Sequence, residues 1–198
     1  MAIIVFAHGA GAGPESEFMC SISSFLEQKG HKVHRFAFPY WQIIEQSGKK
    51  RPPDKRNVLD AAFIEQVRIA QQGADDIPLF VMGKSMGARV AFRCADAVDA
   101  KAAIGLGFPF YPPGKPEKHR LDELTNERPK NFILQGTRDP FGKSDWLAAQ
   151  QLPANLQLEW FTDGDHDLRL PKRSGLSQAE AWQLSARSID RFVGKVSG

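Results

Sequence analysis

The chain has 198 residues, of which 42% are hydrophobic and 25% are charged. This composition is typical of a soluble globular protein, and the length predicts a single domain over residues 1–198 with little room for a lid domain. The 26 basic and 23 acidic residues give a formal charge of +3, which is too balanced to indicate nucleic-acid binding. The apolar run after Met1 is shorter than a signal peptide or a membrane span requires. We therefore expect a cytoplasmic protein that does not bind membranes.

Apolar runs and helical spacing alternate along the whole chain. In chain order, strands are predicted at residues 3–7, 33–38, the run that begins at Pro78, 102–106, 132–135 and 156–161. Helices are predicted between them, at residues 15–29, from Asn57 to Gly73, after Ser85, after Ser144 as the cap of a short helix, and after Ser177. Six strands alternating with helices indicate a doubly wound, all-parallel α/β sheet.

Two connections are predicted to be loops. The polar and basic stretch between Tyr40 and Asn57 is interpreted as an exposed loop, with Asn57 as the cap of the next helix. Residues 107–130 contain five prolines and are interpreted as a long loop with one helical turn at residues 121–124. A connection of that length is typically functional or mobile.

The sequence around Ser85 predicts a nucleophile. An apolar run passes directly into Gly83-Lys84-Ser85-Met86-Gly87 and then into helical spacing, which is the strand, sharp turn and helix of a nucleophile elbow. The two glycines allow a tight turn and close packing of the helix. Because a free serine is a poor nucleophile, a histidine and a carboxylate are needed to activate it.

The partners of the serine are expected in the loops that directly follow strands, because reactive groups in a parallel α/β sheet collect beyond the carboxyl ends of the strands. Asp139 is the only carboxylate between the fifth predicted strand and the next helix, and His166 is the only histidine in the C-terminal third. We therefore predict a catalytic triad of Ser85, Asp139 and His166. The backbone N–H groups of Met86 and Ala10, with Gly11 as the alternative to Ala10, are the predicted oxyanion-hole donors.

Competing motifs fail on their spacing. Pro78 stands where a phosphate-binding loop ending in Gly83-Lys84-Ser85 needs its first glycine, and the glycines at 136 and 142 are one residue too far apart for the same motif. The acidic run around His166 resembles the start of a calcium loop, but Leu168 replaces the required glycine. No cofactor and no metal are therefore expected.

Four segments together resemble the α/β-hydrolase superfamily over nearly the whole chain. They are HGAGAG after the first strand, GKSMGARVA at the elbow, GTRDPFG after the fifth strand and DGDHDL near the end. The likeness is to compact, lidless hydrolases related to dienelactone hydrolases, including hydrolase-like testis-expressed proteins. It implies that the superfamily's first two strands are missing and that the sheet order is 2-1-3-4-5-6. Dienelactone hydrolases carry a cysteine where this chain has Ser85, so their substrate is not implied.

The predicted function is hydrolysis of a small acyl ester by a carboxylesterase-like enzyme that forms an acyl-enzyme intermediate. Aromatic residues that follow the second and fourth strands would wall an acyl pocket or simply pack the loops. The candidates are Tyr40, Trp41, Phe108, Phe110 and Tyr111, with His119 as a further residue that lines the pocket. Thioesterase or peptidase activity stays open, and the alternative is a hydrolase-like scaffold that binds a protein partner or small ligand. The sequence leaves open the role of Lys84, of the basic stretch from Lys49 to Arg56, and the oligomeric state.

Overall fold

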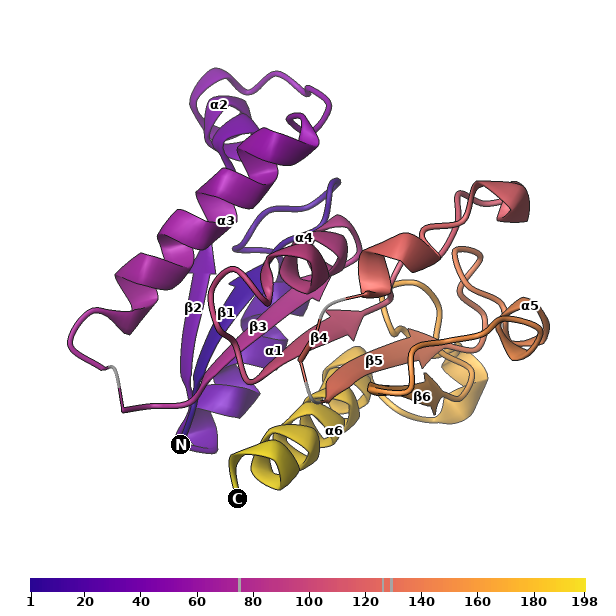
Figure 1. The fold of residues 1–198 in the computed structure, drawn as a ribbon. Coiled ribbons are helices and arrows are strands. Elements are labelled where there is room, and N and C mark those ends of the chain that lie inside the picture. Colours follow the sequence, from indigo (N-terminus) through magenta and orange to yellow (C-terminus); the bar gives the residue numbers. More distant parts are fainter. Residues whose placement is uncertain (75, 126, 129) are drawn as a thin grey trace.

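Six parallel strands form one sheet in the part of the chain that the structure describes (Figure 1). The computed structural model describes residues 1–74, 76–125, 127–128 and 130–198. The strands are β1 (Ile3–Ala7), β2 (Lys32–Phe36), β3 (Leu79–Lys84), β4 (Ala102–Leu106), β5 (Asn131–Gly136) and β6 (Leu156–Phe161). Their order is β2-β1-β3-β4-β5-β6, so the predicted fold class and strand order are confirmed.

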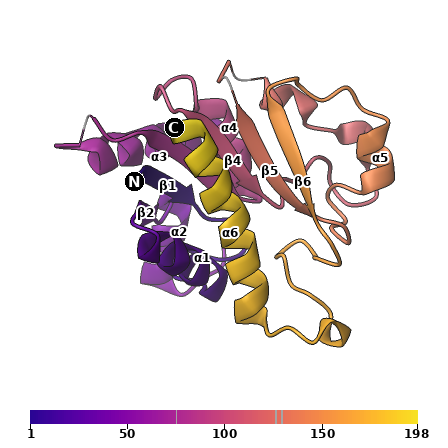
Figure 2. The ribbon, with the colours of Figure 1, turned by 90° about the horizontal axis from the view of Figure 1, so that it is seen from below.

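Helices cover both faces of this sheet. Helices α1 (Glu17–Gln28) and α6 (Gln178–Ser197) lie together on one face, and α3 (Arg56–Gln71) and α4 (Met86–Cys94) lie on the other (Figures 1 and 2). The short helices α2 (Pro39–Ser47) and α5 (Ser144–Ala148) follow β2 and β5 in the chain. Single 3-10 turns are present at Pro116–Lys118, Leu121–Leu124 and Lys172–Ser174. Among the helices of the described residues, none combines the length and apolar character needed to cross a lipid bilayer.

The alternation of side chains along the strands divides the core into two layers. Val5 and Val81 belong to the layer beneath α3 and α4, whereas Phe6 and Met82 belong to the layer beneath α1 and α6. Because both faces of each central strand are covered, the strand sequences are continuous apolar runs instead of alternating ones. This is why the strands were recognisable in the sequence.

Three boundaries in the sequence prediction are wrong. The stretch after Tyr40 is not a loop throughout, because it contains most of α2. This helix begins at Pro39 and ends at Ser47, where Gly48 caps it in the left-handed conformation. Helix α3 begins at Arg56 after Lys55, so Asn57 is inside the helix and does not cap it. Ser144 is likewise the first residue of α5 and not its cap.

The chain direction determines where the site lies. All strand pairs are parallel, so the loops that follow β1, β3, β5 and β6 emerge at the same edge of the sheet. Ser85 directly follows β3, and Asp139 and His166 lie in the loops after β5 and β6. The topology therefore carries the three predicted residues to one end of the molecule.

Candidate active site

Ser85 lies in a strained turn between β3 and α4. Its backbone has φ 53° and ψ −113°, a conformation that a residue with a side chain rarely adopts. A Cβ on Gly83 would lie 2.0 Å from the main-chain carbon of Gly87, and a Cβ on Gly87 would lie 2.4 Å from the main-chain oxygen of Ala7. Only glycine lets the strand and helix approach so closely around the serine. The turn has the geometry that the sequence predicted for a nucleophile elbow.

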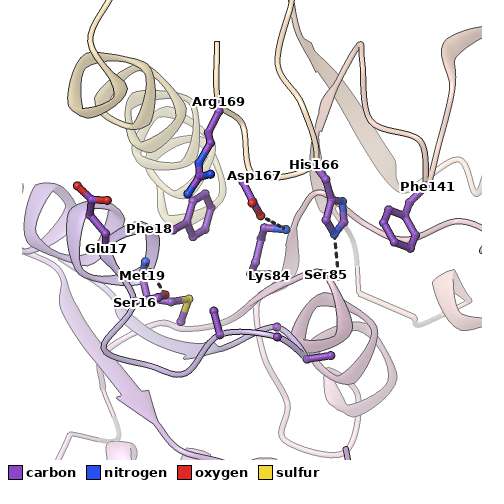
Figure 3. A pocket seen from close by; sticks show the side chains of 14 residues that line it. Ser16, Glu17, Phe18, Met19, Lys84, Ser85, Phe141, His166, Asp167 and Arg169 are labelled. Carbon is purple, nitrogen blue, oxygen red and sulfur yellow. Dashed lines mark hydrogen bonds and ion pairs between the residues drawn. The ribbon is translucent and has the colours of Figure 1, made fainter. Parts of the chain in front are cut away.

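The three residues of the predicted triad form one hydrogen-bonded line. His166 Nε2 lies 2.9 Å from Ser85 Oγ (Figure 3). His166 Nδ1 lies 2.8 Å from Asp139 Oδ2. The carboxylate of Asp139 is fully buried, whereas His166 and Ser85 are partly exposed. The structure therefore brings together three side chains that lie 81 and 27 residues apart in the sequence.

The surroundings of Asp139 determine the proton positions on His166. Gln135 Nε2 donates to Oδ2 of Asp139 and the backbone N–H of Phe141 donates to Oδ1, each at 2.8 Å. When this carboxylate is ionised it only accepts hydrogen bonds, so Nδ1 of His166 must donate to it. Nε2 is then the acceptor for the Ser85 hydroxyl, which is the arrangement that a general base requires.

The loop that carries His166 is held by its neighbours. Oδ1 of Asp165 accepts hydrogen bonds from the backbone N–H groups of Asp167 and Arg169, each at 2.9 Å. The indole Nε1 of Trp182 donates to the carbonyl oxygen of Asp167 at 2.9 Å. Leu168 is buried in the core with a positive φ of 53°. Asp165 thus orders the histidine loop, as expected for a polar loop around His166.

Lys84, whose orientation the sequence left open, lies inside the site. Its ammonium group is 3.2 Å from Oδ1 of Asp167, beside the hydrogen bond between His166 and Ser85 (Figure 3). Burial lowers the pKa of Lys84, and Asp167 opposes this effect without cancelling it. Burial would raise the pKa of Asp167, but Lys84, together with His166 and Arg169, lowers that pKa overall.

The loop after β1 carries Ala10, one of the predicted oxyanion donors, and runs beside Ser85. A Cβ on Gly9 would lie 3.6 Å from the Cβ of Ser85, so this loop runs directly beside the serine. Tyr40 holds the loop, because its hydroxyl lies 3.1 Å from the carbonyl oxygen of Gly9 and 3.2 Å from that of Ala10. Ala10 and Met86 line one cavity together with Ser85, and the N–H of Met86 is the first of helix α4.

His8 shapes the same loop. Its Nε2 accepts from the backbone N–H of Phe38 at 3.1 Å, so its proton is on Nδ1, 2.7 Å from the carbonyl oxygen of Gly9. Burial lowers the pKa of this histidine, which favours the neutral form. His8 therefore has a structural place in the loop and does not compete with His166.

Two cavities meet at Ser85. They share Ala10, Ser85 and Phe141. The larger has a volume of about 430 Å³ and is also lined by Gly9, Gly11, Ala12, Ser16, Glu17, Phe18, Met19, Lys84, His166, Asp167 and Arg169. The smaller has a volume of about 350 Å³ and is also lined by Pro53, Asp54, Arg56, Leu59, Met86, Arg89, Arg93, Pro109 and Arg120. Cavities of this size accept small ligands.

The aromatic pocket expected from the sequence is not formed. None of the candidate residues lines either cavity at Ser85. These candidates are Tyr40, Trp41, Phe108, Phe110, Tyr111 and His119. Phe108 is fully buried, and its ring contacts Phe92 at 5.5 Å and Phe110 at 5.0 Å between centroids. Apolar rings in loops gain more from burial in the core than from exposure in a cleft. These residues pack the loops.

The remaining candidates also have packing contacts. Tyr111 stacks edge-on against Trp146 at 4.7 Å, and His119 is exposed, with its ring 6.1 Å from that of Trp146. Trp41 lies directly over Gly13, where a Cβ would be 2.0 Å from its indole nitrogen. Phe141 lines both cavities at Ser85, and its ring centroid is 4.4 Å from that of His166. Its position two residues after Asp139, in the same loop, was a signal that the sequence analysis did not use.

Comparison with known proteins agrees with this architecture. Residues 1–194 match the family described as "Alpha/beta hydrolase domain", and no curated protein sequence matches the chain significantly. An alpha-beta serine hydrolase homologue from Coxiella burnetii has a TM-score of 0.71 at 16% identity, with 95% of this chain and 85% of that chain covered. A dienelactone hydrolase from Anabaena variabilis has a TM-score of 0.68 at 18% identity, with 94% and 84% covered.

A third solved structure has the same lidless form. XC6422 from Xanthomonas campestris, an a/b serine hydrolase without a lid, has a TM-score of 0.66 at 17% identity, with 95% of this chain and 82% of that chain covered. At these identities the solved structures establish the fold alone. The fold and the family match together support hydrolase activity. This chain belongs to the alpha/beta hydrolase domain family.

Proposed function

We propose that this protein is a serine hydrolase that cleaves small acyl esters through an acyl-enzyme intermediate. The observation that carries the proposal is the line of hydrogen bonds from Ser85 through His166 to the buried Asp139, at 2.9 and 2.8 Å. A general base within hydrogen-bond reach of a hydroxyl, and itself oriented by a carboxylate, is the arrangement that activates a serine. A pure binding scaffold has no need of this arrangement.

The reaction would proceed in two halves. Ser85 Oγ attacks the ester carbonyl carbon while His166 Nε2 takes the hydroxyl proton, and Asp139 stabilises the imidazolium that forms. The backbone N–H groups of Met86 and Ala10 hold the negative oxygen of the tetrahedral intermediate. The C–O bond to the alcohol then breaks and His166 gives its proton to the leaving oxygen. Water, deprotonated by His166, attacks the acyl-enzyme, and collapse of the second intermediate releases the acid and restores Ser85.

The two cavities at Ser85 fit the two parts of an ester. Ser85 lies where the cavities of about 430 and 350 Å³ meet, so a carbonyl at Oγ has space on both sides. Cavities of these volumes are in the range that holds a small ligand. We therefore favour a small ester over a peptide, with thioesters accessible to the same chemistry.

The proposal is tested with a fluorophosphonate probe and short 4-nitrophenyl esters. We expect the probe to label Ser85 alone, and Ser85→Ala to abolish labelling and to lower kcat at least about 10⁴-fold. Ser144→Ala, which changes an exposed serine at the start of α5, serves as the control and should match the wild type. Ester hydrolysis that persists in a folded Ser85→Ala variant would refute the assignment. A folded wild-type protein that neither reacts with the probe nor cleaves any ester would instead favour the scaffold.

A further inference from the structure

The smaller cavity at Ser85 is rich in arginine. Four of the residues that line it are Arg56, Arg89, Arg93 and Arg120. They come from the start of α3, from α4 and from the long connection after β4, so they are far apart in the sequence. Four guanidinium groups around a cavity of about 350 Å³ concentrate positive charge next to the proposed nucleophile.

Carboxylates balance most of this charge. Glu123 accepts two hydrogen bonds from Arg89 at 2.6 Å and one from Arg93 at 3.3 Å. Asp60 pairs with Arg93 and lies 3.5 Å from Arg56, and Asp54, which also lines the cavity, pairs with Arg51 at 3.2 Å. Within the described residues, these four guanidinium groups share three carboxylates, and Arg120 forms an ion pair with none of them. The cluster therefore retains an excess of positive charge.

Arg120 is the member of the cluster without a carboxylate in the described residues. Its guanidinium donates one hydrogen bond, at 2.6 Å, to the carbonyl oxygen of Pro109, which also lines the cavity. Burial and the neighbouring Arg89 both lower the pKa of Arg120, while Glu123 opposes them. An arginine in such surroundings would be stabilised by an additional anion.

The position of His166 shows which part of an ester would enter this cavity. During the first half-reaction His166 must protonate the leaving alcohol oxygen, so the alcohol part has to lie on the side of the imidazole. His166 lines the larger cavity and does not line the smaller one. The larger cavity, with Phe18 and Lys84 in its wall, therefore receives the alcohol part (Figure 3). The arginine cavity receives the acyl part.

We propose that the arginine cavity binds a carboxylate at the far end of the acyl chain, so that the preferred substrates are half-esters of dicarboxylic acids. This inference rests on the proposed function, because it assigns the two sides of the site from the role of His166. Arg120 is the anchoring residue: its guanidinium forms charge-assisted hydrogen bonds with the substrate carboxylate. Arg89 and Arg93, held by Glu123, supply positive potential around it.

The test compares three esters on the purified full chain. Mono-4-nitrophenyl adipate carries a carboxylate on the acyl part, 4-nitrophenyl hexanoate is the neutral ester with the same acyl length, and 4-acetoxybenzoate carries its carboxylate on the alcohol part. The variants are Arg120→Gln, Arg120→Lys and the control Arg191→Gln on α6, whose side chain is largely exposed. Thermal unfolding checks that each variant folds.

We expect Arg120→Gln to lower kcat/KM for the adipate half-ester about 10- to 100-fold and to change the other two esters less than about threefold. Arg120→Lys should restore part of the loss, because it keeps the charge but not the planar fork. Arg191→Gln should leave all three rates unchanged. In the wild type, added salt should lower turnover of the adipate half-ester relative to hexanoate, a result that needs no variant.

Other outcomes overturn the inference in distinguishable ways. An equal loss for all three esters assigns Arg120 a structural role, and a selective loss for 4-acetoxybenzoate places the anion on the alcohol side. If the protein hydrolyses the hexanoate ester but its rate on the adipate half-ester depends neither on Arg120 nor on salt, the inference is refuted and the proposed hydrolase function stands. No turnover of any ester by folded wild-type protein refutes the proposed function itself.

Discussion

Lys84 and Asp167 form an ion pair that runs alongside the hydrogen bond between Ser85 and His166. Lys84 directly precedes the serine and Asp167 directly follows the histidine, and their Nζ and Oδ1 atoms are 3.2 Å apart. The Lys84 side chain is 8% exposed, whereas that of Asp167 is 48% exposed. The pair thus joins the same two segments as the proposed catalytic hydrogen bond, and it does so with one buried and one half-exposed partner.

Replacing Lys84, the buried partner, should lower the activity while changing the stability little. Lys84→Met removes an ammonium that is costly to bury and leaves a half-exposed carboxylate that water can solvate, so the free energy of unfolding should change by less than about 1 kcal/mol. The loop of His166 loses its ion pair to the elbow. The imidazole should then be displaced slightly, which should lower kcat about 10-fold with little change in KM. Urea unfolding and steady-state kinetics on a neutral ester measure the two effects.

Asp167→Asn is the matched change on the other partner, and it should lower the free energy of unfolding by an amount that depends on pH. It leaves the buried ammonium unpaired, which should cost about 3 kcal/mol of unfolding free energy at pH 7. Burial already lowers the pKa of Lys84, and without Asp167 its folded-state pKa falls further below the ordinary value of 10.5. The deficit relative to the wild type is complete below the folded-state pKa of Lys84 in the variant. It shrinks as pH rises toward the folded-state pKa of Lys84 in the wild type, which is itself below 10.5, because the lysine of the variant loses its proton first. A deficit that stays constant between pH 7 and pH 10, or one smaller than that of Lys84→Met, would show that the pair does not act in this way.

The sequence was sufficient to predict the sheet and to predict that three polar residues lie at one edge of it. Strands such as Ile3–Ala7 are buried on both faces, so their sequences are unbroken apolar runs. Once the strands are placed, parallel topology alone puts the ends of β3, β5 and β6 at one edge. Asp139 was found because it is the only carboxylate between the fifth strand and the next helix, and His166 because it is the only histidine in the C-terminal third of the sequence.

The same positional rule failed for the aromatic residues and could not find the arginine cavity. Phe108 and Phe110 also follow a strand, but whether an apolar ring lines a cleft or enters the core depends on the space left by neighbours, which the sequence does not contain. Helix α2 was missed because only Tyr40, Trp41 and Ile44 carry its helical spacing among polar residues. Arg120 belongs to no motif. It directly precedes the 3-10 turn at Leu121–Leu124, and Glu123 in that turn forms ion pairs with two arginines of α4.

The elbow itself should tolerate no methyl group at Gly83. A Cβ there would lie 2.0 Å from the main-chain carbon of Gly87 and 2.2 Å from the nitrogen of Ala88, and backbone atoms cannot rotate away. Gly83→Ala must therefore push α4 away from β3, and we expect the free energy of unfolding to fall by about 3 kcal/mol or more. Chemical denaturation followed by far-UV circular dichroism measures this loss.

Gly194→Ala in α6 is the control for the glycine variant, with an effect of opposite sign. Apart from its chain neighbours and the backbone of its own helix, no heavy atom of the described residues lies within 4 Å of a Cβ at this position, and the residue is inside a helix. Alanine should stabilise the protein there by about 0.5–1 kcal/mol. If Gly83→Ala unfolded at the same denaturant concentration as the wild type, the close approach of α4 to β3 would not be a constraint on the elbow.

Asp139→Asn should disable the proposed triad while leaving the other residues of the site in place. Every partner of this side chain donates: the amide of Gln135, the backbone N–H of Phe141 and Nδ1 of His166. The N–H of asparagine that faces His166 finds no acceptor there unless His166 moves its proton to Nε2, which is the tautomer that cannot accept from Ser85. We expect kcat to fall roughly 10⁴-fold. The unfolding free energy should fall by about 2 kcal/mol from the unsatisfied donor.

Asp145→Asn provides the comparison for this prediction, because Asp145 is an exposed carboxylate in the adjacent helix α5. It should keep kcat and change the unfolding free energy by less than about 0.5 kcal/mol. A folded Asp139→Asn protein with kcat within tenfold of the wild type would mean that His166 does not need this carboxylate to hold its proton on Nδ1. Some other group would then have to orient the imidazole. Of the described residues only Asp139 and Ser85 form hydrogen bonds with that ring, so the result would count against His166 as the base.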